Sequence, residues 1–180
     1  MLARLVLPWL LPLSGHAQHV PPAPPPLAQQ RVRLDVPFFP DRADQCGPSA
    51  LASVLSFWGA AADPADLKKE VYRPELKGSL NVDLVLAAQA HGMSAEMLSG
   101  GLPELRRELD AGHPVIAFLN VGFAFYPIGH YMVVTGYDDA LGGVYAHSGA
   151  RKDSFVPYPR FLKQWERNEL WALLILPSVR

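Results

Sequence analysis

The first half of the chain carries the hydrophobic spacing of amphipathic helices. Four apolar side chains recur at i, i+3, i+4 and i+7, which places them on one face of a helix. They are Leu51, Val54, Leu55 and Trp58. Pro48 fits the first turn of this helix, where its missing N–H leaves no hydrogen bond unmade, and Gly59 suits its end. Comparable start and stop signals predict helices that begin at Asp63, run from Asn81 to about Ala90, and run from Pro103 to Leu109.

The second half changes to the pattern of strands. Apolar or alternating runs predict strands over residues 31–36, 114–119, 130–137, 144–147 and 170–176, with a short helix over 159–166. Because the helices precede most of the strands, the fold class is α+β. We expect an N-terminal helical half packed on an antiparallel sheet.

The N-terminus has the pattern of an export signal. Arg4 precedes the apolar run Leu5–Leu13, which is too short to span a bilayer, and small residues stand at the −3 and −1 positions of a cleavage site after Ala17. His16 occupies the place that a lipid-modified cysteine would need, so no lipid anchor is expected. We therefore predict a signal peptide over residues 1–17 and a periplasmic or secreted protein, against the alternative of an N-terminal helix that is retained.

Proline-rich sequence separates this signal from the folded part of the chain. Five of the seven residues in Val20–Pro26 are proline, which favours an extended spacer over residues 18–29. The remaining residues, 30–180, are long enough for one domain and too short for two ordinary ones. No other apolar stretch is long enough to span a membrane, so no integral membrane span is expected after the signal is cleaved.

Composition and charge narrow the classes of function. The chain has 180 residues, of which 49% are hydrophobic and 18% charged, and its formal net charge is −1. This balance argues against non-specific nucleic-acid binding, which needs an excess of cationic side chains. A single cysteine excludes an intramolecular disulfide and any site built from several cysteines of one chain.

That cysteine, Cys46, lies where the first helix begins. Unpaired N–H groups and the helix dipole at this end favour the thiolate, which is the reactive form of cysteine. An unpaired thiol in an exported protein is also exposed to oxidation, so its presence favours a nucleophile. The alternative is a buried, inert cysteine that packs as a small apolar residue.

A thiolate nucleophile needs a base, and His130 is the best placed histidine. It begins the most apolar predicted strand, where a sheet would hold it rigidly; the alternative is a histidine of the core. His113, His130 and His147 are each 17 residues apart, but no short pair of the HxxxH type accompanies them. A zinc triad is therefore not expected.

Two segments carry a family resemblance. Asp44–Ala52, with the sequence DQCGPSALA, and Gly129–Asp138, with the sequence GHYMVVTGYD, resemble the C39-like cysteine peptidases. His147-Ser148-Gly149 is similar to the strand end of a stand-alone exported subgroup. The resemblance implies a papain-like fold, Cys46 as nucleophile and His130 as general base, with no metal and no organic cofactor.

The chain departs from the family's pattern at two positions. The family has an aspartate that orients the histidine, and the matching place here holds Ser148 with His147 beside it. The family also has an oxyanion-donating glutamine, and Asp41 stands at about that place; Gln45 could substitute for it. Asp138 and Asp139 lie beyond the predicted strand, more than roughly 20 Å from His130 at about 3.3 Å per residue.

Three functions follow from these residues. The first is an exported cysteine peptidase that acts on a peptide or protein substrate through Cys46 and His130, with Gln45 at the oxyanion and His147 or Ser148 orienting His130. The second is a catalytically silent relative that binds peptides in the same cleft. The third is a papain-like amidase of peptidoglycan.

The segments Phe123–Pro127 and Gly78–Leu80 are candidates for the borders of the cleft, although Phe123–Pro127 fits a core or loop segment equally well.

Overall fold

A computed structural model describes residues 31–41, 44–123 and 125–178. The predicted signal, residues 1–17, and the predicted spacer, residues 18–29, lie outside these described residues. No helix within the described ranges is both long enough and apolar enough to cross a membrane.

The first half forms three helices, as the sequence predicted. They are α1 (Cys46–Phe57), α2 (Pro64–Val71) and α3 (Asn81–Ala90), with a short 3₁₀ turn, η1 (Pro74–Leu76), between the last two. The Asp63 carboxylate accepts a 2.7 Å hydrogen bond from the Ala65 N–H and so caps α2. Gly59 has a φ of 80°, the left-handed conformation that ends α1.

The second half forms most of a seven-stranded sheet with the order β2-β7-β3-β4-β5-β6, and β1 also pairs with β4. All neighbouring strands run antiparallel. The strands are β1 (Arg31–Arg33), β2 (Met93–Leu98), β3 (Val115–Asn120), β4 (Gly129–Asp138), β5 (Gly143–Ser148), β6 (Arg151–Pro157) and β7 (Ala172–Pro177).

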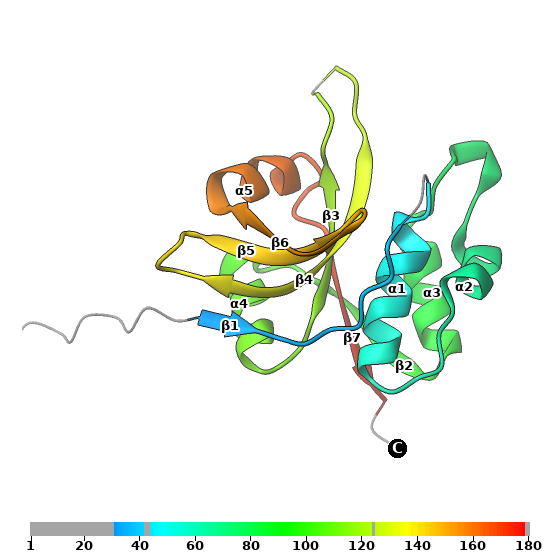
Figure 1. Ribbon diagram of the computed structural model, residues 1–180. Coiled ribbons are helices and arrows are strands. Elements are labelled where there is room, and N and C mark those ends of the chain that lie inside the picture. The colour runs from blue at the N-terminus through cyan, green and yellow to red at the C-terminus, as the bar shows by residue number, and fades with distance from the viewer. Residues whose placement is uncertain (1–30, 42–43, 124, 179–180) are drawn as a thin grey trace, which may run out of the picture.

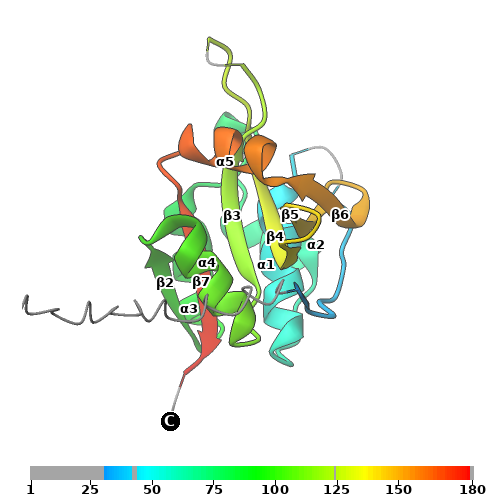
Figure 2. The ribbon, with the colours of Figure 1, turned by 90° about the vertical axis from the view of Figure 1, so that its left-hand side faces the viewer.

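Helices cover both faces of this sheet (Figures 1 and 2). One buried cluster joins α1, α2 and α3 to Ile116, Val133 and Leu173 of the central strands. A second cluster joins α4 (Gly101–Asp110) and α5 (Tyr158–Glu166) to the neighbouring residues of the same strands, such as Val115 and Val134. This division follows from the alternation of side chains along a strand, and it explains why the central strands read as continuous apolar runs.

Two strands are absent from the elements that the sequence predicted. They are β6 (Arg151–Pro157), which begins with the polar run Arg151–Lys152–Asp153, and β2 (Met93–Leu98). Both are edge strands with largely exposed or half-exposed side chains, so neither shows the apolar alternation that marks a half-buried strand. Their conformation depends on pairing with β5 and β7.

Candidate active site

Cys46 is the first residue of α1, so its sulfur lies at the helix N-terminus as the sequence predicted. Gln45 is the N-cap residue, and the N–H of Ser49 bonds its carbonyl oxygen at 3.0 Å. A side chain at Gly47 would overlap Ser79, with 2.6 Å between its Cβ and the Ser79 hydroxyl oxygen. Glycine next to the cysteine therefore allows the loop before α3 to approach the start of α1.

Cys46 and His130 are brought together from distant parts of the chain. His130 is the second residue of β4, and α1 packs against that strand. A carboxylate oxygen of Asp41, the sulfur of Cys46 and a ring nitrogen of His130 all lie within 4.8 Å of one another. All three residues are half-buried. The thiol, the imidazole and a carboxylate therefore share one site.

Ser148 contacts the imidazole. The Nε2 atom of His130 lies 2.8 Å from the Ser148 hydroxyl oxygen. When this nitrogen donates its hydrogen to Ser148, Nδ1 keeps a lone pair, which makes it the ring nitrogen available to the thiol. The structure thus places Ser148, in the position that the resemblance assigns to an aspartate, against His130.

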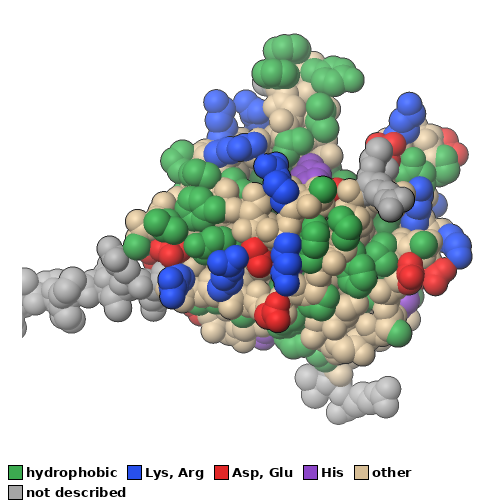
Figure 3. Space-filling view, viewed as in Figure 1, with side chains coloured by type: hydrophobic (Ala, Val, Ile, Leu, Met, Phe, Trp, Pro, Cys, Tyr) green, Lys and Arg blue, Asp and Glu red, His purple; other side chains and the backbone are tan. Residues whose placement is uncertain are grey.

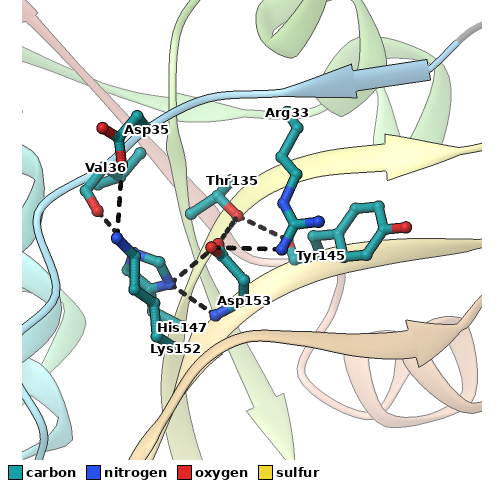
Figure 4. Close-up of polar contacts among 8 residues, drawn as sticks. All are labelled: Arg33, Asp35, Val36, Thr135, Tyr145, His147, Lys152 and Asp153. Carbon is teal, nitrogen blue, oxygen red and sulfur yellow. Dashed lines mark hydrogen bonds and ion pairs between the residues drawn. The ribbon is translucent and has the colours of Figure 1, made fainter.

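His147 makes its hydrogen bonds elsewhere, because successive residues of a strand point to opposite faces. Its Nε2 lies 2.9 Å from the Val36 carbonyl oxygen, and its Nδ1 accepts a 3.1 Å hydrogen bond from the N–H of Asp153 (Figure 4). The Asp153 carboxylate also contacts Nδ1 at 3.5 Å. His147 is buried and joins β5 to β6 and to the segment after β1.

Asp41, which stands at about the place of the family's glutamine, reaches the site. Its backbone N–H donates a 3.1 Å hydrogen bond to the Gly149 carbonyl oxygen, so the turn after Ser148 holds this loop. Burial raises the pKa of the Asp41 carboxyl, and His130 opposes that effect. Gln45 is not among the described residues that line the cleft beside Cys46.

Burial dominates the electrostatics of the pair. It raises the pKa of the Cys46 thiol, an effect that Asp41 reinforces and that the backbone N–H groups of Tyr131, Gly47 and Cys46 oppose. Burial also lowers the pKa of His130, with Asp41 acting in the opposite direction. Both shifts favour a neutral thiol beside a neutral imidazole. The helix N-terminus, from which we expected a thiolate, lowers the pKa of the thiol through its backbone N–H groups, and burial acts against it.

A cleft of about 710 Å³ opens beside the pair. Both segments proposed as its borders line it: Gly78–Leu80 on one side, and Tyr126 and Pro127 on the other. The second border belongs to the hairpin between β3 and β4, which projects from the body and carries exposed apolar side chains (Figures 1 and 3). Asn120 fixes the base of this hairpin by accepting hydrogen bonds from the N–H groups of Gly122 and Ile128, each at 3.0 Å.

Tyr131 belongs to the site and was not singled out from the sequence. Its backbone N–H contacts the Cys46 sulfur, and its hydroxyl donates a 2.6 Å hydrogen bond to the Asn81 side-chain oxygen. Burial raises its pKa, so the hydroxyl stays protonated. Its place directly after His130 is the signal that could have drawn attention to it.

The three histidines spaced 17 residues apart do not form a zinc triad. The Nδ1 atom of His113 lies 3.0 Å from a Glu108 carboxylate oxygen, and His147 contacts Val36 and Asp153. Among the described residues, the one group of three potential metal ligands is Asp41, Cys46 and His130.

Comparison of the sequence with known families and proteins gives two matches. The model of the Peptidase_C39 like family matches residues 26–169. An uncharacterized protein of Methanothermobacter marburgensis is 36% identical over 94 residues, which cover 52% of this chain and 58% of that protein. The chain thus matches less than two thirds of that relative's length.

Several solved structures resemble this one. A C39-like peptidase described from Bacillus anthracis has a TM-score of 0.68 at 20% identity, covering 84% of this chain and all of that one. A double glycine motif protease from an AMS/PCAT transporter, in complex with the leader peptide, has a TM-score of 0.66 at 21% identity, with coverage of 82% and 95%. The peptidase domain of Streptococcus ComA scores 0.64 at 23% identity, with coverage of 79% and 98%. At these identities the likeness shows a shared fold.

Proposed function

Since the chain belongs to the Peptidase_C39 like family, we propose that it is an exported cysteine peptidase that cleaves peptide bonds with Cys46 and His130. The papain-like α+β fold that the resemblance implied is confirmed. The observation that carries the proposal is the placement of a thiol and an imidazole within 4.8 Å of each other beside a cleft of about 710 Å³.

The proposed reaction begins from the neutral pair. The Cys46 sulfur attacks the carbonyl carbon of the substrate while its proton passes to Nδ1 of His130. The tetrahedral intermediate collapses, the C–N bond breaks, and His130 returns the proton to the leaving amine. Water then attacks the thioester with His130 again as base, which releases the acid and restores the thiol.

Stabilisation of the oxyanion depends on backbone N–H groups in this proposal. Those at the start of α1 have no partner within the helix and point toward negative charge that develops there. An ionised Asp41 opposes that charge, whereas its protonated form can donate a hydrogen bond. We therefore expect slower catalysis than with an amide at this position, unless Asp41 is protonated.

The cleft supports a peptide or protein substrate. A related fold has been solved with a leader peptide bound. In this chain the exposed side chains of Tyr126 and Ile128 offer apolar surface on the cleft wall. The pattern of residues 1–17 supports export.

The experiment uses the chain from residue 18 onward, in the presence of a chelator, with a mixture of proteome-derived peptides as substrate. Mass spectrometry identifies new peptide termini. We expect cleavage by the unaltered protein and loss of cleavage, by at least a factor of about 10³, in Cys46→Ser and His130→Ala. His113→Ala is the matched control and should retain activity. Cleavage that persists in Cys46→Ser would contradict the proposal.

The second candidate function is a peptide-binding module without catalysis. It is favoured by the hydroxyl of Ser148 in place of a carboxylate and by Asp41 beside the sulfur. It predicts that the unaltered protein and Cys46→Ser bind the same peptides with equal affinity, and that neither cleaves them. Fluorescence anisotropy with labelled peptides recovered from the mixture distinguishes the two functions.

A further inference from the structure

Three different ligand atoms converge at the start of α1. Asp41 offers a carboxylate oxygen, Cys46 a sulfur and His130 a ring nitrogen, and these atoms all lie within 4.8 Å of one another. We infer that Asp41, Cys46 and His130 form a binding site for a divalent cation of the zinc class. Occupancy of this site would hold the thiol in an inactive state, and this regulatory part rests on the proposed function.

The set of donors suits zinc better than calcium or magnesium. Thiolate, imidazole and carboxylate are the three protein ligands that zinc accepts, whereas the hard cations prefer oxygen alone. With metal–ligand distances of about 2.0–2.3 Å, neighbouring ligand atoms around tetrahedral zinc lie about 3.5 Å apart. Movements of about 1 Å from the present separations would close the site. Three protein ligands leave the fourth position for water.

The surroundings support each ligand. Ser148 lies 2.8 Å from Nε2 of His130, and when that nitrogen carries the hydrogen, Nδ1 keeps the lone pair that a metal needs. Such a contact resembles the outer partners that orient metal-binding histidines. The hydrogen bond from Asp41 N–H to Gly149 holds the carboxylate-bearing loop near the sulfur. Two of the three ligands are therefore held by the end of β5 and by the turn that follows it.

The charges of the three ligands also favour a divalent cation. In the metal-bound state the Asp41 carboxylate and the Cys46 thiolate carry two negative charges within one half-buried site. A divalent cation balances both, with neutral His130 as the third ligand. On binding, the Cys46 S–H bond is lost, a sulfur–metal bond forms and the proton leaves to solvent. The sulfur and the imidazole lone pair are then both engaged, so neither nucleophile nor base remains.

The first experiment measures metal binding directly. Metal-free protein from residue 18 onward is titrated with Co²⁺, and a thiolate-to-cobalt absorption band is recorded; Zn²⁺ stoichiometry is measured by equilibrium dialysis. We expect one ion per chain, loss of the band in Cys46→Ser, and affinity at least tenfold weaker in Asp41→Asn. Asp44→Asn is the matched control, since Asp44 also borders the cleft but lies outside the three-ligand set. Circular dichroism verifies that each variant is folded.

The inference would be overturned if neither the Co²⁺ band nor stoichiometric Zn²⁺ were found. It would also be overturned if folded Asp41→Asn bound the metal as tightly as the unaltered protein does. A second measurement separates it from the proposed peptidase. Zn²⁺ should protect Cys46 from iodoacetamide in the unaltered protein and in Asp44→Asn, and protect it far less in Asp41→Asn, whether or not any peptide is cleaved. Metal binding without cleavage in chelator would contradict the peptidase alone, and cleavage without metal binding would contradict the site alone.

Discussion

The Nε2 atom of His130 lies 2.8 Å from the hydroxyl oxygen of Ser148. This contact can orient the ring and fix its tautomer. A hydroxyl does not stabilise a protonated imidazole as a carboxylate does, because it carries no charge. Ser148 can therefore orient His130 as a base, but it does little to stabilise the imidazolium that forms when His130 takes up a proton.

Replacing Ser148 by aspartate should supply that assistance. We expect Ser148→Asp to raise the pKa of His130, because the new carboxylate favours the imidazolium, and to increase kcat/KM by about tenfold or more. NMR titration of the imidazole and steady-state kinetics measure the two effects. Ser178→Asp adds the same charge at an exposed position and should change neither. An unchanged titration of His130 in Ser148→Asp would contradict the proposed contact.

His147 should matter for stability and not for the chemistry. His147→Ala leaves the Val36 carbonyl and the Asp153 N–H without their buried partner. We expect a loss of about 1–3 kcal/mol in the free energy of unfolding, measured in urea, with the pH profile of activity unchanged. A displaced pH profile with full stability would show that His147 acts on the dyad.

The Asp41 carboxylate should slow alkylation of the thiol. Asp41 contributes to the raised pKa of Cys46, so Asp41→Asn should lower that pKa and increase the rate of iodoacetamide alkylation at pH 7 severalfold. The rate is measured against pH in chelator, with Asp44→Asn as the control. Burial remains the larger cause, so the pKa stays above that of a free thiol. A slower or unchanged rate in Asp41→Asn would argue against this electrostatic effect.

The hairpin between β3 and β4 should influence substrate binding through the residues that line the cleft. Ile128→Ala removes apolar surface from the wall, and we expect KM to rise about fivefold with little change in kcat. Phe125 lies on the same hairpin, is 87% exposed and is not among the lining residues. Phe125→Ala should therefore leave KM unchanged. If both variants changed KM equally, lining the cleft would not explain the effect of Ile128→Ala.

The ion pair between Arg73 and Asp83 lies next to the cleft border Gly78–Leu80, and it should make the stability of the fold depend on pH. Arg73 donates two hydrogen bonds to this buried carboxylate, at 2.6 and 3.0 Å, and they hold the pKa of Asp83 below its ordinary value. A carboxylate with a lowered pKa contributes stability above the unfolded value of about 3.9 and loses it as the pH falls through the folded value.

Asp83→Asn should therefore lower the free energy of unfolding at pH 7 by about 1–2 kcal/mol. It should also reduce the loss of stability below pH 4. Urea unfolding at several pH values measures both effects. Asp35→Asn, at a carboxylate 96% exposed in its pair with Lys152, is the control and should have little effect. A stability curve for Asp83→Asn that is parallel to that of the unaltered protein would exclude the linkage.

Local signals explain what the sequence predicted correctly. The Asp63 cap and the apolar spacing after Cys46 act within a few residues, so α1 and α2 could be placed closely. Strands β2 and β6 owe their conformation to neighbours in the sheet and carry weak patterns of their own. Ser148 and His147 illustrate a signal that was available: alternation along β5 allows only one of them to face His130.

The approach of Asp41 to Cys46 and His130 could not be read from spacing. It depends on the backbone contact with Gly149, which joins segments more than a hundred residues apart in the chain. The resemblance placed Asp41 near the position of the family's glutamine. It did not predict how close the Asp41 carboxylate lies to the Cys46 sulfur. Burial likewise arises from the packed fold, and it raises the pKa of the thiol, against the effect expected from the helix N-terminus.

Strand β4 also determines how the protein can be held. Its second residue is His130, and its last residue, Asp138, pairs with Arg31 at the start of β1. Eight residues at 3.3 Å each separate these points by about 26 Å. A fusion partner or a solid support joined ahead of Arg31 would thus meet the fold at the far end of β4. The protein can be immobilised through that end for peptide screening with its cleft open to the solution.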